Sequence, residues 1–246
     1  KLIKIQRNRS QVIYCFGLDL LFVTVLARKK TNEVWFEIGD IRVFKNKYLE
    51  KCFTFIYSKF IFKHVDFISV TSNGFKNYLF DKFSIPTSKI FVKENFLLRD
   101  NFLKVSCEVK EFPEQFIVGI VGFLRYDTIL SFLKEYKKRE ENKFIIHIYG
   151  QGPIIDEILN IIQNTNIKYF GEFKYPVDLE RIYKKIHFSY VLYDNSDLNV
   201  RLALPNKLYE SIFFKTPLLV SENTFLCEKT TLEFNIGKCF DPMKQN

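Results

Sequence analysis

The chain has 246 residues, of which 47% are hydrophobic and 26% are charged, and its formal net charge is +9. This composition excludes a disordered chain, and nine glycines with seven prolines are too few for a collagen-like or low-complexity sequence. We therefore expect one large or two smaller packed domains. The apolar stretches are interrupted by charge or stop short of the ~20 residues that cross a bilayer, so no transmembrane helix is predicted.

The positive charge is concentrated in the first half. Up to Gln115 the chain holds 20 Lys and Arg against 12 Asp and Glu, whereas the remainder holds 17 against 16. A basic field of this extent favours an anionic partner, such as a phosphate-bearing substrate, an anionic lipid surface or nucleic acid. Ordinary solubilising lysines are the alternative.

Short β-branched and aromatic runs alternate along the chain with longer segments of helical period, which is typical of parallel sheets built from βαβ units. The predicted strands are 12–16, 34–38, 66–71, 89–93, 116–121, 143–149, 167–170, 188–192 and 218–221. The predicted helices are 19–29, 46–63, 74–82, 127–140, 153–163, 176–185, 205–214 and 224–234.

A polar stretch without clear period, residues 97–115, is the best candidate for a boundary. It predicts two Rossmann-like α/β domains, residues 1–112 and 113–246. Open α/β sheets bind ligands beyond the carboxyl ends of their strands, so we expect the two parallel sheets to face each other across a cleft that holds the ligand.

Five cysteines are spread along the chain with no C-x-x-C pair and no nearby histidine cluster. They predict reduced core thiols of a cytosolic protein, with a disulfide framework as the alternative, and no metal site. The only methionine is Met243, so we expect the chain to begin inside a longer protein.

Two glycine-bearing turns follow predicted strands. Gly122 and Arg125 follow the strand that starts at residue 116, where a glycine lets a ligand approach and an arginine can grip phosphate oxygens. Gly150 follows the next strand, in the run Tyr-Gly-Gln-Gly-Pro, which lacks the full G-x-G-x-x-G spacing of a dinucleotide fingerprint. Each is also compatible with a plain turn between strand and helix.

A third segment, residues 199–221, is the most informative. If Pro205 opens a helix, Asn206 and Lys207 lie at its positive end, which suits a diphosphate. Glu210 lies one turn further on and could accept paired hydrogen bonds from ribose hydroxyls. The alternative is an amphipathic helix with a surface ion pair between Lys207 and Glu210.

These segments resemble family 4-like glycosyltransferases of the GT-B fold, group 1 type. The run Leu-Pro-Asn-Lys-Leu-Tyr-Glu-Ser, followed by Lys-Thr-Pro-Leu-Leu-Val-Ser, is similar to that family's nucleotide-sugar signature. Three further elements stand in the family's order, at residues 149–153, 168–173 and 236–242. Looser similarities in the first half lie at residues 14–19, 35–40 and 67–74.

The resemblance implies roles for individual residues. Arg125 and Lys207 would contact the sugar diphosphate, with Gly122 and Asn206 beside them, and Glu210 would hold the ribose. Contacts with the base or the sugar would come from Gly150, Gly171, Phe173, Asn199 and Pro205. No metal or other cofactor is expected, because cations and a helix N-terminus can stabilise the departing nucleoside diphosphate.

The sequence also departs from the family pattern. A second glutamate of the family motif would fall at Leu202, and Asp194, Asp197 or Asn199 could replace it. A glycine-rich first βα unit and the closing helices have no counterpart, so we expect a chain truncated at both ends. In the first half, Glu37 and Asp40 could orient or deprotonate an acceptor hydroxyl, although Asp40 could instead cap the next helix.

The predicted function is transfer of a sugar from a UDP- or GDP-sugar to a glycan or lipid-linked acceptor, with retention, in polysaccharide or glycoconjugate biosynthesis. A non-catalytic GT-B partner and a GT-B sugar epimerase are the alternatives. The basic aromatic helix 48–64 could rest on an anionic membrane, or could be a plain buried helix. We expect a cytoplasmic protein, peripheral at the inner membrane face, that does not bind nucleic acid.

Overall fold

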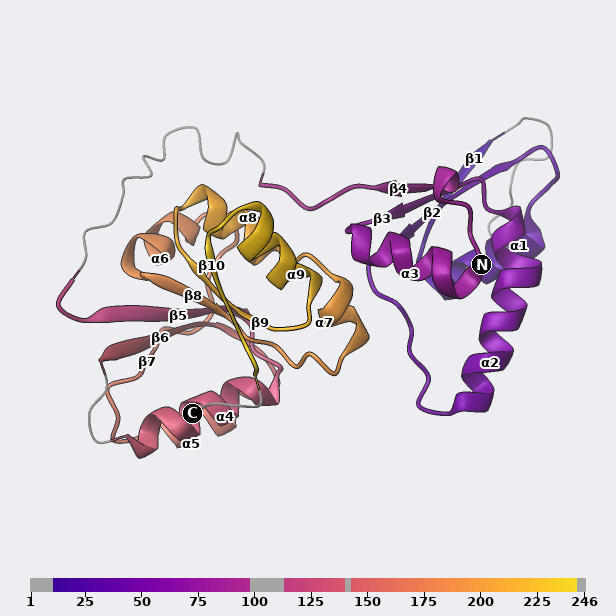
Figure 1. Ribbon diagram of the computed structural model, residues 1–246. Helices are drawn as coiled ribbons and strands as arrows, with labels where there is room; N and C mark the ends of the chain where they lie inside the picture. The colour runs from indigo at the N-terminus through magenta and orange to yellow at the C-terminus, as the bar shows by residue number, and fades with distance from the viewer. Residues whose placement is uncertain (1–10, 98–112, 140–142, 243–246) are drawn as a thin grey trace. The chain divides into compact units, whose positions relative to one another are not determined.

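A computed structural model describes residues 11–97, 113–139 and 143–242. The chain divides into two compact units, one up to Glu94 and the other from Asn95 onward. Each unit contains one parallel β-sheet with helices packed on it (Figure 1). The predicted α/β architecture with two Rossmann-like sheets is therefore confirmed.

The first unit contains a four-stranded parallel sheet in the order β1-β2-β3-β4. Its strands are β1 (Val12–Phe16), β2 (Glu33–Ile38), β3 (Phe67–Val70) and β4 (Ile90–Val92). The connecting helices are α1 (Leu18–Ala27), α2 (Lys47–Ile56) and α3 (Asn73–Phe83), with a short 3-10 turn η3 (Thr87–Lys89) before β4.

Side chains alternate across this sheet. Cys15, Phe36 and Ile68 point into the core beneath the helices and are at most 5% exposed. On the opposite face, Trp35 and Phe67 are 39% and 36% exposed, and their ring centroids lie 5.1 Å apart. Within the part of this unit that the structure describes, helices therefore cover one face of the sheet (Figure 1).

The predicted helix 46–63 is divided into three parts. After α2, the chain continues as a π-helix, η1 (Tyr57–Ile61), and a 3-10 turn, η2 (Phe62–His64). Asn46 caps α2 by accepting hydrogen bonds from the amides of Tyr48 and Leu49 at 2.8 and 3.3 Å. The alternative role of Asp40 as the cap of this helix is therefore wrong, since the chain runs on for six residues before α2 begins.

The second unit contains a six-stranded parallel sheet in the order β10-β9-β8-β5-β6-β7. Its strands are β5 (Phe116–Phe123), β6 (Phe144–Gln151), β7 (Lys168–Tyr169), β8 (Phe188–Val191), β9 (Leu218–Ser221) and β10 (Gly237–Phe240). Its helices are α4 (Asp127–Lys138), α5 (Ile155–Ile162), α6 (Leu179–Lys185), α7 (Leu198–Leu202), α8 (Asn206–Phe213) and α9 (Phe225–Glu228), which a π-helix, η5 (Lys229–Glu233), extends.

Helices cover both faces of this sheet. In Figure 1, α4 and α5 lie on one side, and α6, α8 and α9 lie on the other. The α4 and α5 side is packed by Ile129, Leu133 and Ile158, and the opposite side by Tyr183 and Leu208, all nearly or fully buried. Two apolar layers explain why β5 and β6 read as almost continuous hydrophobic runs.

The chain joins the second unit at Asn95, whose side-chain amide donates to the carbonyl of Leu204 at 3.0 Å. Leu97 packs against the cluster around Tyr183. The predicted boundary between residues 112 and 113 lies at the end of a segment, 98–112, that is outside the described residues.

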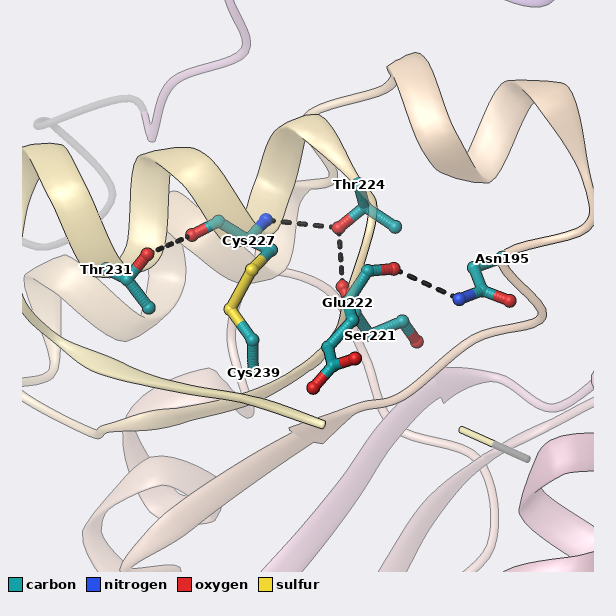
Figure 2. The surroundings of a disulfide bond; sticks show 7 residues. All are labelled: Asn195, Ser221, Glu222, Thr224, Cys227, Thr231 and Cys239. Atoms are coloured by element: carbon teal, nitrogen blue, oxygen red, sulfur yellow. Dashed lines mark hydrogen bonds between the residues drawn. A yellow bond between two sulfur atoms is a disulfide. The ribbon is translucent and has the colours of Figure 1, made fainter. Parts of the chain in front are cut away.

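The structure contradicts the prediction that all the cysteines are reduced thiols. Cys227 on α9 and Cys239 on β10 form a disulfide, with 5.8 Å between their Cα atoms (Figure 2). They meet because α9 follows β9 directly and β10 pairs with β9, a strand that the sequence did not predict. Cys15 is a buried free thiol and Cys52 an exposed one, and Cys107 lies outside the described residues.

Among the residues that the structure describes, no helix has the length and hydrophobicity needed to cross a membrane.

Candidate nucleotide-sugar site

Three glycines line up at the carboxyl ends of β5, β6 and β7. Gly122 is the register partner of Gly150, and the amide of Gly150 donates to the carbonyl of Gly171 at 2.7 Å. Their φ angles are 127°, 132° and 76°, a region that residues with a side chain rarely adopt. The sequence predicted all three as ligand contacts, and the structure places them side by side.

The turn after β6 leaves no room for a side chain. A Cβ atom at Gly150 would lie 1.8 Å from the carbonyl oxygen of Gly122, and one at Gly152 would lie 2.1 Å from the carbonyl oxygen of Leu124. A Cβ at Gly171 would meet nothing within 4 Å. Gly150 and Gly152 are thus required because the backbone packs closely against them, whereas Gly171 has open space around its Cα.

Helix α8 brings a cation to this row of glycines. Pro205 is the N-cap of α8 rather than its first helical residue, and Asn206 opens the helix in an exposed position. One residue later, Lys207 is only 8% exposed, and its Cε lies 3.4 Å from the position of a Cβ on Gly122. The end of β5 and the start of α8 therefore meet through Lys207.

Lys207 and Glu210 form a buried ion pair, not the surface pair of the alternative reading. The Lys207 Nζ donates to Glu210 Oε2 at 2.5 Å, and the Tyr183 hydroxyl donates to the same oxygen at 2.8 Å. Glu210 is 1% exposed. Burial, together with the Glu210 carboxylate, raises the pKa of Tyr183 well above its ordinary value, so this phenol remains a hydrogen-bond donor.

Arg125 lies on an aromatic pair. Its Nη2 donates to the Tyr126 hydroxyl at 2.7 Å, and its guanidinium carbon lies 4.9 Å from the centre of that ring. Tyr126 stacks on Tyr193 with 4.4 Å between the ring centroids. Burial raises the pKa of Tyr193, and so do Tyr126 and Glu210, whereas Arg125 lowers it. Arg125 and Glu210 thus act on the same phenol.

The sequence missed the three tyrosines 126, 183 and 193. Two of them follow strand ends, Tyr126 after β5 and Tyr193 after β8, which is where ligands bind in open α/β sheets. Tyr183 carried no signal, because a tyrosine on a helix reads as a core residue until its partner Glu210 is known to be buried.

The remaining predicted contacts have local structural roles. Asn199 lies in the short helix α7, which the sequence did not predict. Its backbone amide donates to the Asp197 carboxylate at 2.8 Å. Asp194 accepts from the amide of Ser196 at 2.9 Å. Phe173 packs against the cluster around Tyr183. Two of the acids suggested as replacements for the absent glutamate at Leu202 therefore hold turns in place.

Glu37 and Asp40 belong to the first unit. Glu37 is half-buried in β2, and its carbonyl accepts from the amide of Gly17 at 3.5 Å, while Asp40 is exposed beyond the carboxyl end of the strand. Their catalytic role stays a prediction. Among the described residues of both units, no group of three or more His, Cys, Asp or Glu is arranged to hold a metal ion.

No family model matches the chain. A stretch of 97 residues, 38% of this chain, is 30% identical to the succinoglycan biosynthesis protein ExoL of Rhizobium meliloti (strain 1021) and covers 24% of that protein. Solved structures match almost the whole chain. A glycosyltransferase from Rickettsia africae ESF-5 superposes with a TM-score of 0.67 at 17% identity, over 94% of this chain and 62% of that one.

Two further structures agree. The lipopolysaccharide outer core galactosyltransferase WaaB gives a TM-score of 0.66 at 14% identity, over 95% of this chain and 62% of that one. Alr3699/HepE from Anabaena, determined in complex with UDP, gives 0.68 at 12% identity, over 96% of this chain and 66% of that one. The chain has the GT-B fold.

The GT-B fold confirms the family resemblance of the sequence at the level of architecture. The chain spans 62% of the length of the Rickettsia structure and 24% of ExoL. In this GT-B chain, the residues that the resemblance assigns to the donor, from Gly122 to Glu210, all lie in the second unit.

Proposed function

We propose that the chain is part of a glycosyltransferase that moves a sugar from a UDP- or GDP-sugar to a glycan or lipid-linked acceptor, in polysaccharide or glycoconjugate biosynthesis. The observation that carries this proposal is the meeting of the three aligned glycines with Lys207 at the start of α8. Such a site combines close backbone approach with positive charge, which a nucleoside diphosphate needs.

The comparisons support this choice of ligand. Anabaena Alr3699/HepE was determined with UDP and with UDP-glucose, and the name of ExoL places it in the biosynthesis of a polysaccharide, succinoglycan. Both inferences come from similar proteins, so a nucleotide-sugar donor and a glycan product are what we propose for this chain.

In the proposed reaction, the protein stabilises the negative charge that develops on the leaving group. When the bond between sugar and diphosphate breaks, the departing nucleoside diphosphate gains negative charge. Arg125, Lys207 and the free amides at the start of α8 would stabilise that charge more in the transition state than in the bound donor. These groups would do so without a metal ion. Retention of configuration is proposed from the family resemblance.

Glu210 has a further proposed role. Its Oε2 already accepts from Lys207 and Tyr183, which fixes the carboxylate in one orientation. A carboxylate held in this way could accept from the ribose hydroxyls through its other oxygen at little entropic cost. On the acceptor side, Glu37 or Asp40 would orient or deprotonate the attacking hydroxyl.

A non-catalytic partner that binds nucleotide sugar is the second candidate. Leu202 stands where the family has a carboxylate, and the nearby Asp194 and Asp197 hold local turns. A chain that binds the donor without turning it over would fit these facts.

Product analysis separates the candidates. The chain would be incubated with a panel of UDP- and GDP-sugars and with glycan acceptors, with and without a chelator, and products followed by mass spectrometry. A transferase forms a glycosylated acceptor and releases the nucleoside diphosphate, in the presence of chelator as well. Binding without turnover would identify the partner, and an altered free sugar would identify an epimerase.

A further inference from the structure

A groove in the first unit runs along α2 and η1 and ends against the last turn of α3. Its volume is about 790 Å³, and four lysines line it, Lys47, Lys51, Lys59 and Lys82. The single acid in its lining, Glu50, is paired with Lys82. Lys47, Lys51 and Lys59 follow one another at intervals of four and eight residues, which places them on one face of the helical segment formed by α2 and η1.

An exposed aromatic rim lies beside the groove. Phe55 and Phe60 are 58% and 52% exposed, and their ring centroids lie 6.0 Å apart. The Nζ of Lys63 lies 5.4 Å from the centre of the Phe60 ring. Tyr48, two turns before Phe55, is 84% exposed. No residue of α2 is buried, whereas the segment that continues it buries Tyr57, Ile61 and Phe62. The predicted helix 48–64 is therefore buried only in its second part.

The net charge of the whole chain resides in this unit. Residues 1–94 hold 17 Lys and Arg against eight Asp and Glu, a net charge of +9, whereas residues 95–246 hold 20 of each kind. A groove with four lysines on the charged unit is therefore suited to an anionic partner. The exposed phenylalanines indicate that this partner also offers an apolar surface.

We propose that this groove and its aromatic rim dock the chain on an anionic lipid bilayer. The lysines would meet lipid phosphates, while Phe55 and Phe60 would enter the boundary between headgroups and acyl chains. Nucleic acid would satisfy the lysines too, but the two rings meet edge to face at 71° and offer no parallel platform for successive bases.

Docking on a bilayer would bring the protein to a lipid-linked acceptor, although it requires neither a nucleotide sugar nor catalysis. Vesicle binding thus tests the surface independently of the proposed transferase activity. A chain that binds vesicles but transfers no sugar would keep this proposal and defeat the other.

The test is cosedimentation of the chain with phosphatidylcholine vesicles that contain or lack phosphatidylglycerol. We expect binding only to the anionic vesicles, and a decrease as salt is added. The variant Lys51→Ala/Lys59→Ala should bind about 30-fold more weakly, because each lysine near an anionic surface contributes about one fivefold step. The variant Phe55→Ala/Phe60→Ala should also bind more weakly, with the salt dependence kept.

Lys134→Ala/Lys168→Ala is the matched control, since it removes two exposed lysines from the second unit. It should bind vesicles as the wild type does, and circular dichroism should show every variant folded. Equal binding by the groove variant and this control would overturn the proposal. So would equal binding to neutral vesicles, or complete displacement from anionic vesicles by single-stranded RNA, which would favour a nucleic-acid surface.

Discussion

Lys207 and Glu210 form an ion pair in the interior of the second unit, with 10% and 1% of their side chains exposed. Breaking such a pair leaves a charge without its partner in a poorly hydrated place. Glu210→Ala should therefore destabilise the fold by about 3 to 5 kcal/mol, measured by urea denaturation. Loss of nucleotide binding in that variant could come either from the lost ribose contact or from the destabilised fold.

Glu210→Gln separates the two roles. Its amide oxygen can still accept from Tyr183 and Lys207, so we expect a smaller loss of stability than in Glu210→Ala. Affinity for the nucleotide should nonetheless fall, because a neutral amide accepts weaker hydrogen bonds from ribose than a carboxylate does. Unchanged affinity in a folded Glu210→Gln protein would contradict the ribose role.

The row of glycines makes a second prediction. Gly150→Ala should destabilise the second unit by about 3 kcal/mol or more, since its Cβ collides with backbone at a positive φ. Gly171→Ala, also at positive φ but in open space, should cost only about 1 to 2 kcal/mol. Equal denaturation midpoints for the two variants would show that the close approach of Gly122 and Gly150 is not present.

His147 predicts how stability depends on pH. Burial, with help from Lys168 and Lys185, lowers the pKa of this histidine from 6.5 to about 4. Between these values the unfolded chain binds a proton that the folded chain does not, so His147 makes stability fall as pH drops from 6.5 toward 4. Denaturation midpoints measured across that range should fall less steeply for His147→Gln than for the wild type. Parallel curves would contradict the pKa shift.

The disulfide of the second unit can be tested with a free cysteine of the first unit as control. The double variant Cys227→Ser/Cys239→Ser should unfold with about 3 kcal/mol less stability, because the bridge closes a short loop in the unfolded chain. Cys52→Ser, at an exposed thiol, should stay within about 0.5 kcal/mol of the wild type. A reductant should lower the stability of the wild type but not of the double variant. A wild type indifferent to reductant would contradict the bridge.

Most of the fold could be predicted because its strands are short, apolar and separated by long helical segments. Nine of the ten strands found in the described residues, and the order of the helices there, follow from that alternation. β10 was missed because Gly237, Lys238 and Cys239 lack an apolar pattern, and its place in the sheet depends on pairing with β9. Helix α7 is only five residues long and depends on a cap from Asp197, a local contact that periodicity does not detect.

The site was only partly predictable for a similar reason. Glycines at strand ends are visible in sequence, since few other residues tolerate such turns. The burial of Lys207 and Glu210 is not, because an i, i+3 pair looks the same on a surface and in a core until α6 supplies Tyr183. The disulfide was missed because its cysteines lie 12 residues apart, and Cys239 is placed by the pairing of β10 with β9, which the sequence did not predict.

Calorimetric titration of the chain with UDP and with GDP tests the proposed donor site, which lies wholly in the second unit. We predict that one of the two nucleotides binds at one site per chain. Arg125→Ala should weaken that binding about tenfold or more, through loss of a charge-assisted hydrogen bond to phosphate. Arg139→Ala, which removes an exposed arginine beyond the end of α4, should leave it unchanged. Binding of neither nucleotide, or equal affinity in the two variants, would contradict the account.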